Sequence, residues 1–349
     1  MASHIETGLL RAWLRRGLTA RLLWPLSKLF QLLVGFRAGL FLMGYKRQTR
    51  LPVPVVVVGN IFVGGTGKTP LTIWLVQQLQ AAGWKPAVVS RGYGASAATI
   101  VEARADASAT AVGDEPLLIA QRTGCPVMVG RNRVEAAQAL LHRYPETDVI
   151  VSDDGLQHYA LARDVEIMLF DQRGVGNGWM LPAGPLREPA GRRSDFTVLN
   201  MSGAKAGAEA PGVDSGAARM QLVADVASNL ADPTASLTMA QLAARAGKIL
   251  AAAGIGNPER FFSMLRSAGL QIETMSLPDH HDFADHPFKA VQADMILITE
   301  KDAVKCRQIE SMRQDARLWV VPVSAQLDAD FAVKLVEKIS EKQNGRSLA

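Results

Sequence analysis

Short apolar runs alternate with amphipathic stretches over most of the chain. Strand-like runs fall at 53–58, 86–90, 126–129, 147–152 and 165–170, and helical patterns lie near 68–82, 114–123 and 131–143. Short apolar strands separated by helices are typical of a parallel sheet with helices on both faces. The pattern therefore predicts an α/β domain with a parallel sheet flanked by helices over 51–201.

A run of small and polar residues, "SGAKAGAEAPGVDSGAA", interrupts this pattern at 202–218. Such a run predicts a linker or loop. Strand-like runs resume at 219–224, 248–253, 270–275, 294–299 and 318–322. We expect a second, smaller α/β domain over 219–349.

Residues 1–50 have a different character. The stretch 22–45 is rich in Leu and Phe but is interrupted by Pro25, Lys28 and Arg37. A free-standing transmembrane helix prefers about 20 apolar residues with few charges. The pattern favours a helix that lies on or dips into a membrane, with basic side chains at the headgroups. The alternative is an amphipathic helix packed on the protein's own core.

Charge supports a membrane partner for this segment. No acidic residue stands between Glu6 and Glu102, although the net charge of the 349-residue chain is only +5. Such a basic segment is attracted to anionic lipid or to nucleic acid. Interleaved aromatic residues for base stacking are few, so we expect an anionic membrane surface and no nucleic acid. No protein partner is implied.

The cysteines exclude two further classes of protein. Cys125 and Cys306 are too few for a disulfide framework and lack the C-x-x-C spacing of a zinc site. A reduced compartment such as the cytosol follows.

The first strand leads into "GNIFVGGTGKTP" (59–70), which ends as a phosphate-binding P-loop does and predicts a P-loop NTPase-like sheet for the domain 51–201. In such a loop backbone N–H groups surround phosphate oxygens, the lysine reaches the β- and γ-phosphates, and the next hydroxyl binds Mg²⁺. We expect ATP phosphates on 62–69, namely Phe62, Val63, Gly64, Gly65, Thr66, Gly67, Lys68 and Thr69. Phe62 stands where the general consensus has glycine, so the loop entrance must differ from the usual one.

A second carboxylate for the metal is expected after a neighbouring strand. "DVIVSDDGLQH" (148–158) supplies Asp153 and Asp154 there. Two adjacent carboxylates are costly unless a cation neutralises them, so both are candidates for Mg²⁺ beside Thr69. The alternative is a turn with Asp-Asp-Gly chemistry. By contrast, "GIGNPERF" (254–261) is not a dinucleotide fingerprint, because Glu259 replaces the third glycine.

With these motifs placed, the sequence closely resembles the tetraacyldisaccharide 4'-kinases of lipid A synthesis. Five further stretches carry the resemblance in family order: "SRGYG" (90–94), "GDEP" (113–116), "DDGLQH" (153–158), "LPAGPLREP" (181–189) and "PDHHDF" (278–283). The family also has a non-glycine residue at the position of Phe62. The resemblance covers essentially the whole chain.

The resemblance implies an inner-membrane enzyme with its active site on the cytoplasmic face. It would transfer the γ-phosphate of MgATP to the 4'-hydroxyl of a tetraacyldisaccharide 1-phosphate, forming lipid IVA. An alternative from another class is a membrane-associated P-loop ATPase that acts as a switch or positioning protein. That protein would share the P-loop and the acidic pair but would need no acceptor site.

The resemblance also implies roles for individual residues. Asp114 is the expected catalytic carboxylate, paired with His280 and acting beside Lys68; the alternatives are a helix cap for Asp114 and His281 as its partner. The expected acceptor or phosphate contacts are Arg91, Tyr93, Gln157, His158, Arg187 and Glu188. The roles of Lys301 and Lys305 in "TEKDAVK" (299–305) stay open between a solvated face and nucleotide binding.

Overall fold

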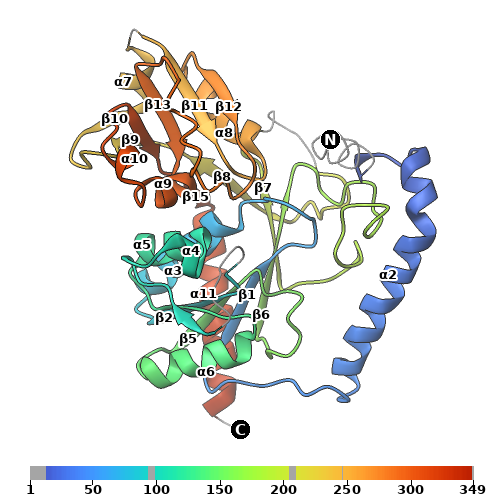
Figure 1. The fold of residues 1–349 in the computed structure, drawn as a ribbon. Helices are drawn as coiled ribbons and strands as arrows, with labels where there is room; N and C mark the ends of the chain where they lie inside the picture. Colours follow the sequence, from blue (N-terminus) through green and yellow to red (C-terminus); the bar gives the residue numbers. More distant parts are fainter. Residues whose placement is uncertain (1–12, 93–98, 204–209, 246, 348–349) are drawn as a thin grey trace.

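Two β-sheets, each with a core of buried parallel strands, organise the chain (Figure 1). The computed structural model describes residues 13–92, 99–203, 210–245 and 247–347. The predicted α/β class is confirmed, and nearly all the expected strands and helices form within one to three residues of their predicted bounds. The strand predicted at 270–275 has the largest of these shifts, because it begins at Glu273.

The first sheet has nine strands in the order β15-β8-β7-β6-β1-β5-β2-β4-β3. Parallel pairing of β1 with both β5 and β6 brings the carboxyl ends of these strands to one edge, where α/β proteins bind ligands. The strands are β1 (Val55–Gly59), β2 (Pro86–Ser90), β3 (Val101–Glu102), β4 (Val127–Val129), β5 (Val149–Asp153), β6 (Val165–Asp171), β7 (Phe196–Asn200), β8 (Ala218–Val223) and β15 (Ser324–Leu327).

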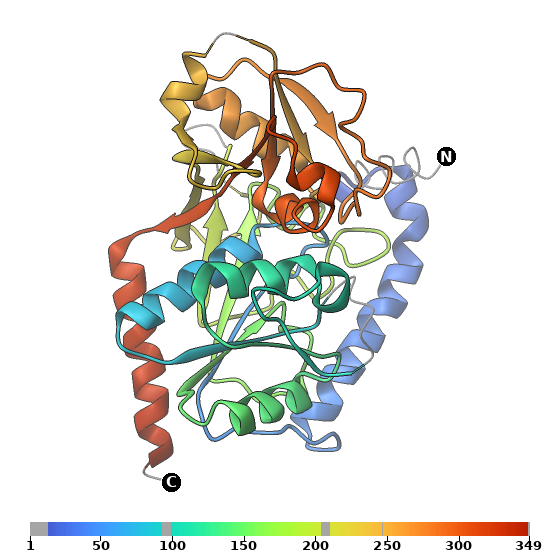
Figure 2. The same cartoon turned by 60° about the vertical axis from the view of Figure 1, so that its left-hand side comes forward.

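Helices cover both faces of the first sheet. Leu75, Leu117 and Leu335 share the apolar core on one face, and Leu140 lies in the core on the other face with Phe30 packed against it. The first face carries α3 (Lys68–Ala81), α4 (Ala109–Val112), α5 (Asp114–Thr123) and α11 (Ala329–Ser347); the second carries α6 (Arg133–Arg143) and α2 (Leu18–Leu42). Figure 2 shows α2 (blue) and α11 (red) on opposite sides of this unit.

The second sheet has six strands in the order β10-β9-β14-β13-β11-β12. Its strands are β9 (Val226–Asn229), β10 (Ser236–Thr238), β11 (Ile249–Ala253), β12 (Glu273–Ser276), β13 (Met295–Thr299) and β14 (Leu318–Val321). Its helices are α7 (Met239–Ala243), α8 (Pro258–Ser267), α9 (Glu300–Cys306) and α10 (Glu310–Arg313). Apolar cores lie on both faces, around Phe262 and Phe288.

The division of the chain between the two sheets differs from the expected boundaries. β8 pairs with β7, and β15 pairs with β8, so both strands belong to the first sheet. α11 also returns to that unit, where Phe331 and Ile339 are buried in its core. The second sheet is thus built from 226–321, inside the predicted domain 219–349. Apolar periodicity marks strands but does not show which sheet each one joins. Of the predicted linker 202–218, residues 204–209 lie outside the described residues.

α2 packs on the first unit by a narrow side. Ala20 and Ser27 are its buried residues, and the Ser27 hydroxyl donates to the carbonyl of Met180 at 2.7 Å. By length and composition α2 is able to cross a membrane, the one such helix within the ranges described above. Its outward side exposes large apolar residues: Leu18, Leu22, Trp24, Leu26, Leu29, Leu32, Leu33, Phe36 and Leu42.

Candidate active site

The loop between β1 and α3 has the backbone geometry of a phosphate cradle. Gly64 and Gly67 both have a φ of 102°, a conformation that strongly favours glycine. A Cβ at Gly67 would also lie 2.6 Å from the side-chain nitrogen of Asn200. α3 begins at Lys68, so its N-terminal N–H groups face the space where phosphates would bind.

Phe62 ties the entrance of this loop to the "LPAGPLREP" segment. Its side chain is 2% exposed, and its backbone forms an antiparallel bridge with Leu186. The next N–H, of Val63, donates to the carbonyl of Pro185 at 2.9 Å. The non-glycine residue is therefore part of the packed wall of the loop.

Asn60 holds the loop from inside and was not among the predicted residues. Its buried amide donates to the carbonyl of Phe62 at 2.7 Å and to the Thr66 hydroxyl at 2.9 Å. Its amide oxygen accepts from Lys68 Nζ at 3.3 Å. Thr69 is buried at the start of α3.

The acidic pair follows β5, beside β1. Asp153 is buried, and its two carboxylate oxygens accept from the hydroxyls of Thr72 at 3.2 Å and Ser90 at 3.3 Å. Burial raises the pKa of Asp153, and the charges of Glu115 and Asp154 act in the same direction. A cation bound beside Asp153 would therefore offset the free-energy cost of ionising this buried carboxylate.

Asp154 differs from its neighbour because cations already surround it. Arg187 binds both of its oxygens, at 3.0 and 3.2 Å, and Lys68 Nζ lies 3.7 Å from Oδ1. Burial alone would raise the pKa of Asp154, but the charges of Lys68 and Arg187 outweigh it and lower the pKa to about 2. Within the acidic pair, Asp154 is therefore readily ionised, whereas ionisation of Asp153 is unfavourable.

Two further arginines support this edge of the sheet and were missed from the sequence. The buried guanidinium of Arg133 donates to the carbonyls of Asp153 at 3.0 Å and Asp154 at 2.7 Å. Arg173 donates to the carbonyl of Gly65 at 3.2 Å and pairs with buried Asp171. Arg133 lies at the start of the helix predicted over 131–143, where the sequence pattern does not show that its side chain is buried.

Asp171 also joins the two units of the chain. Arg260, from α8 of the second unit, pairs with the same carboxylate at 2.8 Å. Nearby, the turn after β11 lies against the P-loop, since a Cβ on Gly256 would be 3.1 Å from the nitrogen of Gly65. The segment "GIGNPERF" therefore contacts the phosphate loop without being a dinucleotide fingerprint.

Asp114 and His280, which are 166 positions apart, meet across the two units. The Nδ1 atom of His280 lies 3.0 and 3.1 Å from the two carboxylate oxygens of Asp114. Asp114 is 2% exposed and is the first residue of α5, where its Oδ1 also accepts from the N–H of Glu115 at 2.9 Å. The structure thus brings Asp114 and His280 together, whereas the alternative role of helix cap does not apply, because Gly113 is the N-cap residue of α5.

The carboxylate of Asp114 is strongly stabilised in its ionised form. Burial would raise its pKa, but the hydrogen bond with His280 and the charges of Lys301 and Lys305 hold that pKa well below its usual range. An ionised Asp114 accepts from His280 in the tautomer that carries its proton on Nδ1, and in that tautomer Nε2 has the free lone pair of the ring.

His281, the alternative partner, points elsewhere. Its Nδ1 accepts from the N–H of Phe283 at 3.0 Å, and its ring packs edge-on against Phe283 at 4.9 Å. Its Nε2 lies 3.5 Å from Asp285. The described contacts of His281 are those of a residue that shapes the loop.

The remaining predicted residues lie near the acidic pair, with one outside the described residues. Gln157 donates to Glu188 at 2.8 Å, and buried Glu188 pairs with Arg192 at 3.0 Å. Burial lowers the pKa of His158 to about 4, and the charge of Arg133 acts in the same direction. Arg91 is exposed after β2, and Tyr93 lies outside the described residues.

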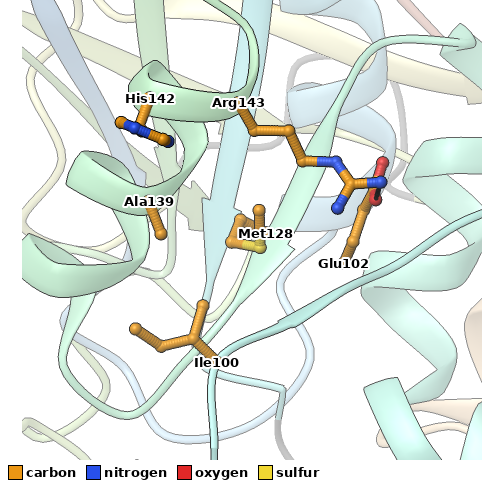
Figure 3. Close-up of a pocket in the computed structure, with 6 residues that line it drawn as sticks. All are labelled: Ile100, Glu102, Met128, Ala139, His142 and Arg143. Atoms are coloured by element: carbon orange, nitrogen blue, oxygen red, sulfur yellow. Dashed lines mark ion pairs between the residues drawn. The ribbon is translucent and has the colours of Figure 1, made fainter.

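A separate hollow lies at the β3 edge of the first sheet, four strands along from β1. Figure 3 shows Arg143 directed toward Glu102 across it, and the two side chains pair at 3.0 Å. The hollow is lined by Ile100, Glu102, Met128, Ala139, His142 and Arg143. None of these residues belongs to the P-loop or to the pair formed by Asp114 and His280.

Comparison with known proteins agrees with this arrangement. The family model described as Tetraacyldisaccharide-1-P 4'-kinase (LpxK) matches residues 19–340. The chain is 59% identical to the tetraacyldisaccharide 4'-kinase of Janthinobacterium sp. (strain Marseille), over 99% of each chain. It is 56% identical to that of Herminiimonas arsenicoxydans, over 99% of this chain and 98% of the relative.

A solved structure extends the likeness to the fold. The crystal structure of the "apo" form of LpxK from Aquifex aeolicus in complex with ATP matches with a TM-score of 0.75 and 27% identity. The match covers 92% of this chain and 99% of that chain.

Proposed function

Because this chain belongs to the tetraacyldisaccharide-1-P 4'-kinase family and is a kinase of lipid A biosynthesis, we propose that the residues described above carry out its phosphoryl transfer. The observation that carries the proposal is the meeting of two elements at one edge of the sheet: a P-loop, and a buried carboxylate–imidazole pair from two separate units. The first suits the nucleotide, and the second suits a hydroxyl acceptor.

ATP is the phosphate donor in this proposal. The N–H groups of 62–69 and the N-terminus of α3 receive its phosphates, and Lys68 supplies a positive charge to the transferred group. Asn60 orients Lys68 from behind, and Arg173 holds the carbonyl of Gly65, so the cradle is fixed before ATP arrives. A fixed cradle avoids reorganisation during the reaction.

Mg²⁺ fits the oxygen ligands that lie beside the cradle. Thr69, Asp153 and Asp154 offer a hydroxyl and carboxylates, the hard oxygen ligands that Mg²⁺ prefers. The described residues hold no cluster of three His, Cys, Asp or Glu, which suits an ion held by one or two carboxylates and by ATP phosphates. When bound, the ion would neutralise charge on the phosphates.

The acceptor is a lipid disaccharide, and its 4'-hydroxyl oxygen forms the new bond to the γ-phosphorus. The bond from that phosphorus to the bridging oxygen of ADP breaks, and ADP leaves. Nε2 of His280 takes the hydroxyl proton, while Asp114 holds the ring through Nδ1 and balances the imidazolium charge. The product expected from this acceptor is lipid IVA.

The outward side of α2 fits the surface of a membrane. Arg37 of this helix donates to the carbonyl of Gln157, and Ser27 donates to that of Met180, so α2 contacts both loops that flank the proposed acceptor site. An acceptor held by its acyl chains in the bilayer would therefore present its sugar to these loops. We place the protein on the cytoplasmic face of the inner membrane, where ATP is available, with anionic headgroups near Arg21 and Lys28.

Transfer of labelled γ-phosphate from MgATP to a tetraacyldisaccharide 1-phosphate in detergent tests the proposal. We expect labelled lipid that depends on both ATP and acceptor. Release of labelled inorganic phosphate at the same rate with and without the lipid, and no labelled lipid, would instead indicate the membrane-associated ATPase. No product on added DNA or RNA is expected.

A further inference from the structure

Lys305 contacts the same carboxylate as His280. Its Nζ atom lies 2.9 Å from Asp114 Oδ2, the oxygen that is 3.0 Å from His280 Nδ1. Lys305 comes from α9 in the second unit, and its side chain is 15% exposed. The carboxylate of Asp114 therefore has three neighbours that fix its position: the imidazole, this ammonium group and the N–H of Glu115.

Lys305 also holds the backbone on which His280 stands. Its Nζ donates to the carbonyl of His281 at 3.0 Å. His280 has a φ of 59°, a left-handed conformation that is unfavourable for a residue with a side chain and must be held by its surroundings. The N–H of His280 donates to the carbonyl of Gly254 at 3.2 Å.

α9 supports the other side of this turn as well. Asp302 accepts from the N–H of Gly254 at 3.0 Å and from the Thr299 hydroxyl at 2.6 Å. One short helix thus fixes Gly254 through Asp302 and the carbonyl of His281 through Lys305. The backbone of His280 lies between these two attachments.

We propose that Lys305 is a positioning residue of the phosphoryl transfer, which fixes the Asp114 carboxylate and the His280 imidazole in one mutual orientation. The inference rests on the proposed function of Asp114 and His280. Without the ammonium group, the carboxylate could rotate away from Nδ1 and the turn carrying His280 would lose one of its attachments. Proton transfer tolerates little misplacement, so the chemical step slows while ATP binding is preserved.

Arg122 provides a matched control at the same boundary between the units. It stands in α5 and pairs with Glu300 of α9 at 2.8 Å, and its side chain is 22% exposed. It therefore contributes a similar ion pair between the units without contacting Asp114 or His280. A purely structural effect of removing a cation between the units should be similar for Arg122 and Lys305.

The test compares Lys305→Met, Lys305→Arg and Arg122→Met in steady-state transfer to the lipid acceptor, with thermal unfolding measured for each protein. We expect Lys305→Met to lower kcat about 10- to 100-fold, as for other residues that orient a reacting group, with KM for ATP within about twofold. Lys305→Arg should recover most of the activity, and Arg122→Met should lower kcat by less than about threefold.

A double-mutant cycle with His280→Ala distinguishes positioning from a separate effect. If Lys305 acts through His280, the loss in kcat caused by Lys305→Met should largely vanish in the His280→Ala protein. Equal losses for Arg122→Met and Lys305→Met, or full additivity in the cycle, would overturn the inference. If the unmodified protein transfers phosphate but His280→Ala is fully active, the proposed function of the pair fails instead.

Discussion

The guanidinium carbon of Arg173 lies 4.3 Å from the centroid of the Phe62 ring. The same guanidinium donates to the carbonyl of Gly65, three residues after Phe62 in the phosphate loop. A ring face attracts a cation, and this attraction strengthens where water is excluded. The aromatic residue at the expected glycine position therefore forms the surface on which a loop-fixing arginine rests.

Phe62→Leu should weaken ATP binding more than its loss of apolar volume explains. A partly buried cation–π contact contributes about 1 kcal/mol, so we expect KM for ATP to rise about fivefold with a smaller change in kcat. Phe170→Leu is the control, because Phe170 is a buried phenylalanine of the same core and the ring on which Arg173 rests is that of Phe62. A similar rise in KM for both variants would show that only packing matters.

Asp114→Ala should lower turnover far more than ATP affinity. The carboxylate contacts His280 and Lys305 and none of the residues of the P-loop for which contacts are described. Removing an acid–base group commonly costs about 100-fold or more in rate, so we expect a loss of that order in kcat with KM for ATP nearly unchanged. Asp106→Ala, at an exposed carboxylate, should leave both constants unaltered. Parallel losses in kcat and ATP affinity would place Asp114 in the nucleotide site.

His158 should make the protein less stable in mild acid. Burial lowers its pKa from 6.5 to about 4, so the unfolded chain takes up the proton first as pH falls. The stability that this group contributes is complete above pH 6.5 and is lost as pH falls toward 4. Urea unfolding of His158→Gln should show a weaker dependence on pH in this window. His142→Gln, at an exposed histidine of α6, should keep the original dependence.

Leu33→Glu should release the protein from vesicles that contain anionic lipid. Leu33 is 59% exposed on α2, and burying a leucine in an apolar medium stabilises binding by about 1.5–3 kcal/mol. We expect the affinity of the variant for these vesicles, measured by sedimentation, to be at least about tenfold weaker than that of the unmodified protein. Val333→Glu changes a residue of α11 with a similar exposure of 57% and should bind as the unmodified protein does. Equal release by both variants would remove α2 as the membrane contact.

Local patterns predicted the elements of the fold better than their assembly. The P-loop and the acidic pair are readable because each is a short motif after a buried strand. β7 was missed because Thr197 and Asn200 are polar, which leaves only a short apolar run in this five-residue strand. The return of β15 and α11 to the first unit depends on pairing between strands about 100 positions apart, which periodicity does not report.

The site residues likewise divide into those that a motif predicts and those whose role depends on the assembled fold. Lys68, Thr69 and the acidic pair follow from motif chemistry, and the pairing of Asp114 with His280 was expected from the family resemblance. Arg133, Arg173 and Arg260 were missed because their roles depend on contacts made after folding, to backbone carbonyls and to Asp171. A charged residue in a loop or at a helix start has no local signal that distinguishes a buried ion pair from a solvated surface.

The two connections between the sheets run side by side. β8 leads into β9 through 224–225, β14 leads into β15 through 322–323, and the strands pair antiparallel on both sides of these short gaps. Two adjacent connections permit rotation mainly about one axis, so we expect the second unit to rotate as one body relative to the first. Such a rotation would carry Gly256 toward or away from the P-loop and, in the same movement, His280 toward or away from Asp114. Binding of the nucleotide and formation of the pair between Asp114 and His280 would then take place in the same domain movement.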